Sequence, residues 1–130
     1  MKSTDFKLIM VALLFIASCV STIQATAASN RDGAVILTYH RFGENIFPTT
    51  NIRLEQFEEH IDELTNGKYN VVPLQTVIKA IRYGEQLPER TVAITIDDAY
   101  ESVYTAAWPR LQQANLPFTV FVSTAAVDQN

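Results

Sequence analysis

TVAITIDD, residues 91–98, is the stretch that decides the fold: six residues that favour a β-strand, followed at once by two aspartates. A short apolar run rich in β-branched residues is typical of a strand buried on both faces of a parallel sheet. Sites in parallel α/β proteins form at the carboxyl ends of the strands. Asp97 and Asp98 are therefore candidate functional residues.

The segments around this strand alternate between two patterns. Short apolar runs predict strands and apolar residues at helical spacing predict helices, in the order strand 34–39, helix 54–64, strand 71–72, helix 74–81, strand 91–96, helix 100–111 and strand 118–122. The run at 34–39 is continuously apolar, so we expect it to be buried on both faces as well. Strands that alternate with helices indicate an α/β fold whose strands pair in parallel through right-handed crossovers.

Pro109 conflicts with a continuous helix over 100–111. Proline lacks a backbone N–H, and its ring clashes with the preceding turn of a helix. Because proline is favoured in the first turn, a short helix followed by a second one that begins at Pro109 resolves the conflict. Trp108 lies at core spacing in the same stripe, so we interpret it as a core residue rather than a sugar-stacking platform.

Composition restricts the classes of protein. The chain has 130 residues, 48% hydrophobic and 18% charged, as expected of one globular domain and unlike a disordered chain. A net charge of −4 without long basic runs argues against nucleic acid as a partner. One cysteine excludes an internal disulfide and a cysteine-rich zinc site.

The amino terminus has the features of an export signal. Lys2 and Lys7 precede or flank an apolar stretch at 8–20, which is shorter than the roughly 20 residues of a membrane-spanning helix. Ala-Thr-Ala at 25–27 matches the pattern that signal peptidase cleaves. We therefore expect an exported protein of the periplasm, the cell envelope or the extracellular space, with no transmembrane helix after cleavage.

This reading divides the chain into a signal peptide at 1–27 and one domain at 28–130. An alternative lies inside the signal segment. Ile-Ala-Ser-Cys at 16–19 resembles a bacterial lipobox, in which Cys19 would carry a lipid anchor and become the new amino terminus.

His40 follows the strand at 34–39 just as Asp97 and Asp98 follow the strand at 91–96. Since the carboxyl ends of parallel strands lie at one edge of a sheet, we expect the three side chains to converge. One aspartate can hold a divalent metal while the other takes a proton from a hydrolytic water. The alternatives are an aspartate that caps the next helix and a structural histidine.

Two further charged residues near these candidates have plainer interpretations. His60 lies in an acidic helix beside Glu59, so we expect a solvated surface histidine rather than a metal ligand. For Arg41, next to His40, a salt bridge to a nearby acid is expected rather than contact with an anionic ligand.

Two stretches resemble the first motif region of the NodB-homology polysaccharide deacetylases: TIDDAY at 95–100 and LPFTVFV at 116–122. LTYHRF at 37–42 resembles the opening strand of those members that begin with a Tyr-His pair, so the resemblance covers nearly all of 34–124. It implies a distorted, partly open (β/α) barrel. It also implies a hydrolase that uses a divalent metal, often zinc, to remove N-acetyl groups from aminosugar polymers or oligomers.

The same resemblance implies a role for each candidate. Asp97 would be the catalytic general base that activates water, Asp98 would bind the metal, and His40 would be the catalytic general acid that protonates the leaving amine. The family motif usually reads Thr-Phe-Asp-Asp-Gly. Ile96 replaces its aromatic residue and Ala99 its glycine, so we expect negative φ at Ala99.

The family's second motif, His-Ser/Thr-x-x-His, supplies two more metal ligands and does not occur in these 130 residues. We therefore expect the chain to carry the amino-terminal half of the domain, and to be inactive and poorly stable alone, because a catalytic zinc takes three protein ligands. Two rival functions stay open: a non-catalytic remnant or carbohydrate-binding module of this fold, and a glycoside hydrolase. Adjacent aspartates on one turn suit the latter poorly, since its two carboxylates must face each other across a sugar ring.

Overall fold

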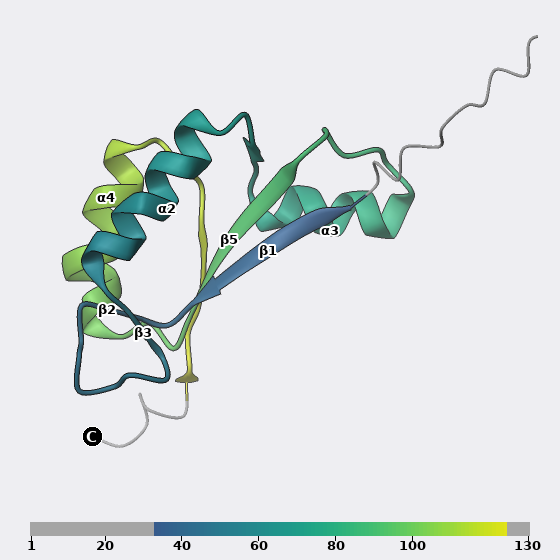
Figure 1. Ribbon diagram of the computed structural model, residues 1–130. Helices are drawn as coiled ribbons and strands as arrows, with labels where there is room; N and C mark the ends of the chain where they lie inside the picture. The colour runs from purple at the N-terminus through teal and green to yellow at the C-terminus, as the bar shows by residue number, and fades with distance from the viewer. Residues whose placement is uncertain (1–32, 125–130) are drawn as a thin grey trace, which may run out of the picture.

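The centre of the sheet is β5 (Thr91–Asp97), the strand of the deciding stretch. The computed structural model describes residues 33–124, and in it β1 (Ala34–Tyr39) pairs in parallel with β5, from Ala34 opposite Thr91 to Tyr39 opposite Ile96 (Figure 1). Along the other edge of β5, β4 (Asn70–Val71) pairs with its start and β6 (Thr119–Phe121) with its end, both in parallel. The parallel α/β class is confirmed, whereas the barrel stays a prediction.

The two long strands differ in burial. Every residue of β5 from Thr91 to Ile96 is buried, as predicted. In β1, however, Val35 is 58% and Ile36 is 47% exposed. The prediction that β1 is buried on both faces is therefore wrong for the described residues. Among them β1 is the edge strand of the sheet, whereas β5 lies between β1 and the pair β4 and β6.

The helices α2 (Leu54–Asn66) and α3 (Leu74–Tyr83) form where the helical spacing predicts them. Each turns an apolar stripe inward: Phe57 and Leu64 are buried on α2, and Val77 and Ala80 on α3. After α3 the chain leaves the helix through Gly84, whose φ of 68° is left-handed and suits glycine at a helix end.

The third helical segment stays continuous near Pro109, but its hydrogen-bond pattern changes there. A π-helix, η1 (Val103–Ala107), continues directly into α4 (Trp108–Gln113), and the N–H of Trp108 donates to the carbonyl of Val103, five residues back. Pro109 lies in the first turn of α4. Two helical pieces were expected and are present, but the wide π turn joins them, because it does not use the N–H that proline lacks.

The π turn also changes which side chains face the core. Val103, Ala107 and Leu111 are buried, whereas Trp108 is 48% exposed. The interpretation of Trp108 as a core residue is therefore wrong, since the wide turn rotates it away from the apolar stripe that a regular helix predicts.

A short parallel pair, β2 (Arg41–Phe42) and β3 (Asn51–Ile52), occupies the region that reads as a loop after β1. Phe42 is buried and packs against Phe57 of α2, with ring centroids 4.6 Å apart. Tyr39, at the end of β1, packs edge-on against the same Phe57 ring at 5.4 Å. These aromatic contacts fix the chain on both sides of His40.

Some sequence predictions fall outside the described residues. The signal peptide at 1–27, its cleavage site and Cys19 all lie before residue 33. Between residues 33 and 124, no helix is long and apolar enough to span a membrane.

Candidate active site

The carboxyl ends of β1 and β5 bring His40 and Asp97 together. Tyr39 lies opposite Ile96 in the parallel register, so the next residue of each strand reaches the same edge of the sheet. Nε2 of His40 lies 3.8 Å from Oδ2 of Asp97, and the two side chains are 35% and 36% exposed. The convergence expected from the sequence is present, and a ligand can reach both groups. Their catalytic roles stay predictions.

Asp98 and Ala99 form the turn that follows β5, and both have left-handed backbone conformations, with φ of 68° and 50°. For residues other than glycine this conformation costs about 1–2 kcal/mol each. The expectation of negative φ at Ala99 is therefore wrong.

The carboxylate of Asp98 belongs to an exposed residue, while Asp97 is half-buried. At the start of the following helix, the N–H of Val103 donates to the carbonyl of Tyr100. The N–H of Val103 is therefore already paired with the backbone and does not need the side chain of a capping aspartate.

No three His, Cys, Asp or Glu side chains between residues 33 and 124 gather closely enough to hold a metal ion. The described residues therefore do not form a complete metal site of the catalytic zinc type, which takes three protein ligands. Asp98 is the one predicted metal ligand among them.

Arg41, the residue after His40, forms the salt bridge that the sequence predicts: its Nη1 lies 2.6 Å from Oε2 of Glu44. The guanidinium also lies between two aromatic rings, 3.9 Å from the centroid of Phe47 and 3.3 Å from that of Tyr100. Stacking of a planar guanidinium on aromatic faces is a specific property of arginine. The aromatic neighbours could not be found from the sequence, since Tyr100 is distant along the chain.

Ser102 extends this contact to the helix. Its hydroxyl donates to Oε1 of Glu44 at 2.5 Å and accepts a hydrogen bond from the N–H of Phe42 at 3.2 Å. The hydrogen bond from Ser102 is the main cause that lowers the pKa of Glu44 from its usual value, and Arg41 adds to it against the opposing effect of partial burial. Burial would lower the pKa of Arg41, but its bonds to Glu44 and Tyr100 raise it overall. We name Arg41, Glu44, Phe47, Tyr100 and Ser102 the Arg41 clasp.

His60 is exposed, as predicted, but it has a specific partner. Its Nδ1 lies 2.9 Å from the hydroxyl of Tyr39 in a hydrogen bond. Burial of the Tyr39 ring raises the pKa of its hydroxyl above the usual value. His60 thus contacts Tyr39, the residue before His40, and not Asp97.

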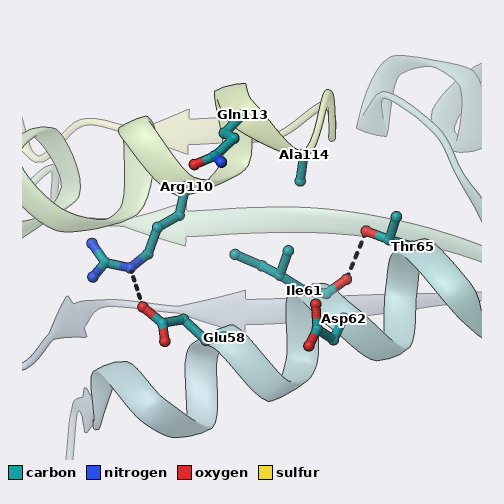
Figure 2. A pocket seen from close by; sticks show the side chains of 7 residues that line it. All are labelled: Glu58, Ile61, Asp62, Thr65, Arg110, Gln113 and Ala114. Carbon is teal, nitrogen blue, oxygen red and sulfur yellow. Dashed lines mark hydrogen bonds and ion pairs between the residues drawn. The ribbon is translucent and has the colours of Figure 1, made fainter.

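Of two cavities in the described residues, one adjoins His40 and the other lies away from the predicted site residues. One, of about 300 Å³, adjoins His40 and is lined by side chains that include Thr38, Thr49, Thr50 and Asn51. Another, of about 440 Å³, lies between α2 and α4, where Arg110 reaches Glu58 at 3.0 Å, as Figure 2 shows. Since the α2–α4 cavity contains none of the predicted site residues, we place the candidate active site at the strand edge.

Comparison with known proteins shows which family part of the chain resembles. Residues 84–130 match the family model of polysaccharide deacetylases, a span that contains β5, Asp97, Asp98 and β6. Over this span the chain is similar to the NodB-type polysaccharide deacetylases. The family resemblance predicted from TIDDAY is thus confirmed, and NodB-type deacetylases are generally metal-dependent.

Individual relatives agree with this family. The chain is 24% identical to the poly-β-1,6-N-acetyl-D-glucosamine N-deacetylase of Escherichia coli K12, over 86% of this chain but only 19% of that protein. Among solved structures, a de-N-acetylase from Aggregatibacter actinomycetemcomitans is 27% identical, with a TM-score of 0.64 over 75% of this chain and 40% of that one. IcaB from Ammonifex degensii is 34% identical, with a TM-score of 0.58 over 70% and 38%. The chain therefore spans less than half the length of each of these proteins.

Proposed function

We propose that this protein is a secreted, metal-dependent deacetylase that hydrolyses the N-acetyl groups of an N-acetylglucosamine polymer. The observation that carries the proposal is the approach of His40 to Asp97 within 3.8 Å, at the strand edge where a deacetylase-type motif ends. The names of the E. coli and Aggregatibacter relatives, both N-deacetylases, support the reaction. Export would bring the enzyme to a polymer outside the cytoplasm.

In this proposal Asp97 acts first. Its carboxylate takes a proton from a water molecule as the water oxygen bonds to the acetyl carbonyl carbon. At 3.8 Å from His40, the Asp97 oxygen lies beyond normal hydrogen-bond length, so its acceptor capacity remains available for water. The half-exposed position of the carboxylate gives that water access.

His40 completes the reaction. A protonated imidazole donates its proton to the amide nitrogen as the carbon–nitrogen bond breaks, which releases acetate and a free amine on the sugar. The two side chains serve opposite ends of one amide, because Asp97 deprotonates the attacking water while His40 protonates the leaving group. Two groups a few ångströms apart fit that division of work.

Asp98 is proposed as one ligand of a divalent cation, with zinc as the first candidate. At least one further ligand must come from outside residues 33–124, because these residues form no three-ligand group. When bound, such a cation polarises the acetyl carbonyl and favours ionisation of the attacking water.

The cavity beside His40 is proposed to hold a sugar ring of the polymer. Its lining includes the hydroxyls of Thr38, Thr49 and Thr50 and the amide of Asn51, groups that can bond sugar hydroxyls. The E. coli relative's name supports a β-1,6-linked N-acetylglucosamine polymer as the first substrate to test.

The test supplies the remainder of a deacetylase domain. We define the joined protein as residues 28–124 of this chain followed by the part of Ammonifex degensii IcaB that lies beyond its matched region. With zinc and an N-acetylated β-1,6-glucosamine oligomer, the joined protein should release acetate, and Asp62→Asn, a change on the exposed face of α2, should leave the rate unchanged. The chain alone should release none. Oligomer binding without acetate release by the joined protein would favour the carbohydrate-binding alternative.

A further inference from the structure

The Asp98–Ala99 turn is strained, and tertiary contacts must hold it. Before the turn, Asp97 is fixed in β5 opposite Phe121 of β6. Two successive left-handed residues other than glycine persist only where the surrounding structure determines the path of the chain. Whatever fixes the residues after the turn therefore also determines where Asp98 points, and it holds the end of β5, with Asp97, in place.

The Arg41 clasp fixes those residues. Tyr100, directly after the turn, lies with its ring 3.3 Å from the guanidinium carbon of Arg41. Ser102, two residues later, is bonded to Glu44 at 2.5 Å. Both partners, Arg41 and Glu44, belong to the segment that follows His40, so the clasp connects the two halves of the candidate active site.

The clasp is itself well anchored. Phe47 covers the opposite face of the Arg41 guanidinium at 3.9 Å, and the side chain of Arg41 is only 15% exposed. The N–H of Glu44 donates to Oδ1 of Asn51 at 2.7 Å, which attaches the loop to β3. The guanidinium of Arg41 is thus held on both faces by aromatic rings and at one nitrogen by Glu44. A side chain held in this way can resist movement of Tyr100, which a mobile surface side chain cannot.

We propose that Arg41 is a positioning residue that holds the Asp98–Ala99 turn in its left-handed conformation and so directs Asp97 and Asp98 toward the edge that carries His40. The effect on the turn depends only on the contacts described. The effect on catalysis rests on the proposed function. Lysine should not replace Arg41, because an ammonium group lacks the planar face that stacks between two rings.

The first test reads the backbone of the turn in the 130-residue chain by NMR. Residues with positive φ give strong NOEs between their own N–H and Hα protons, so Asp98 and Ala99 should show them in the native chain. Arg41→Ala and Arg41→Lys should both weaken these NOEs. Arg110→Ala, which removes the Arg110–Glu58 ion pair of α4 and α2, is the matched control and should leave them intact.

Persistence of both NOEs in a folded Arg41→Ala chain would overturn the proposal. If Arg41→Ala does not fold, Ser102→Ala takes its place, since it removes the hydroxyl that joins Glu44 to the helix without touching the stacked rings. Ser102→Ala should weaken the same two NOEs, and unchanged NOEs would again contradict the clasp.

The second test uses the strain itself. Glycine adopts positive φ without cost, so Ala99→Gly should remove the strain at that residue while leaving the contacts of the clasp in place. Arg41→Ala should then lower the midpoint of thermal unfolding more in the Ala99→Gly background than in the native chain, by about 4–8 °C per 1 kcal/mol of strain, because only in the native chain does loss of the clasp also relieve strain. Equal losses in both backgrounds would show that Arg41 supports the fold but not the turn.

The third test measures catalysis in the joined protein. Arg41→Ala should lower kcat roughly 10- to 100-fold, because small displacements of catalytic groups have such effects, whatever the accompanying change in KM from the cavity that Arg41 also lines. A raised KM with unchanged kcat would contradict positioning of Asp97 and Asp98. No acetate release from the unsubstituted joined protein, together with the expected NOE changes, would refute the proposed function and leave the clasp standing.

Discussion

Parallel pairing of β1 with β5 places Nε2 of His40 3.8 Å from Oδ2 of Asp97, although the two residues are far apart in sequence. The approach follows from register, because Tyr39 lies opposite Ile96 and the next residues, His40 after β1 and Asp97 at the end of β5, lie at the same edge. Each side chain also remains about one-third exposed. Proximity combined with access is what distinguishes this pair from a buried structural ion pair.

The strain at Ala99 predicts that a glycine there stabilises the protein. Ala99→Gly should raise the free energy of unfolding by up to about 1 kcal/mol, because it removes the left-handed cost while adding some entropy to the unfolded chain. Urea unfolding measures the change. Ala106→Gly, within the helical segment after the turn, is the control and should destabilise by roughly 0.5–1 kcal/mol. Destabilisation by Ala99→Gly of the same size would contradict the left-handed turn.

Low pH should reduce the contribution of Glu44 to the stability of the folded chain. The pKa of Glu44 is lowered in the folded state, so the folded chain binds fewer protons than the unfolded chain as the pH falls through the usual value of 4.5. The stability from Glu44 is therefore present above the unfolded pKa and lost as pH falls through the folded pKa.

Thermal unfolding of the native chain and of Glu44→Gln measures this dependence. The native chain should be the more stable of the two near neutral pH, and the difference should shrink as the pH is lowered to about 3. A difference that stays constant over this range would mean that the charge of Glu44 contributes nothing to folding.

The exposure of Trp108 makes a prediction about packing. Leu111 is fully buried in the core, so Leu111→Ala should destabilise by about 2–5 kcal/mol. Trp108→Ala should cost less in spite of its larger side chain, because about half of that side chain already contacts water. Denaturant unfolding of both variants checks the order, and a larger loss from Trp108→Ala would restore the core interpretation.

Export can be tested directly on material recovered outside the cytoplasm. We predict that mass spectrometry finds a chain that begins at Ala28, after cleavage of the Ala-Thr-Ala pattern at 25–27. A chain that begins with a lipid-modified Cys19 would show the anchor instead. Recovery of the full-length chain from the cytoplasm alone would contradict both forms of export.

The spacing of apolar residues predicts the long helices and strands, because the core selects apolar residues on the faces that it buries. The apolar stripes of α2 and α3 and the apolar run of β5 each reflect a face or strand that the core covers. The strand-end position of His40 and Asp97 follows from the same reasoning. By contrast, β2 and β3 contain two residues each, too few for any period to appear.

The features that sequence reasoning missed depend on contacts between distant segments. Ala99 is left-handed because Tyr100 and β5 fix both ends of its turn, and no local preference of alanine predicts that. Trp108 turns outward because the π turn at Val103–Ala107 directly precedes it. The stacking of Arg41 between Phe47 and Tyr100 likewise requires the folded chain, even though its salt bridge to Glu44, three residues away, could be predicted.

The central claim, that His40 and Asp97 act on the same acetamide, is tested most directly by a double-mutant cycle in the joined protein. Acetate release is measured for the unsubstituted protein, His40→Ala, Asp97→Asn and the double variant, at equal zinc loading. Groups that serve one reaction are strongly non-additive, so we predict that each single change removes most of the rate and that the double variant is little slower than the slower single one. A near-normal rate for either single variant would contradict the claim.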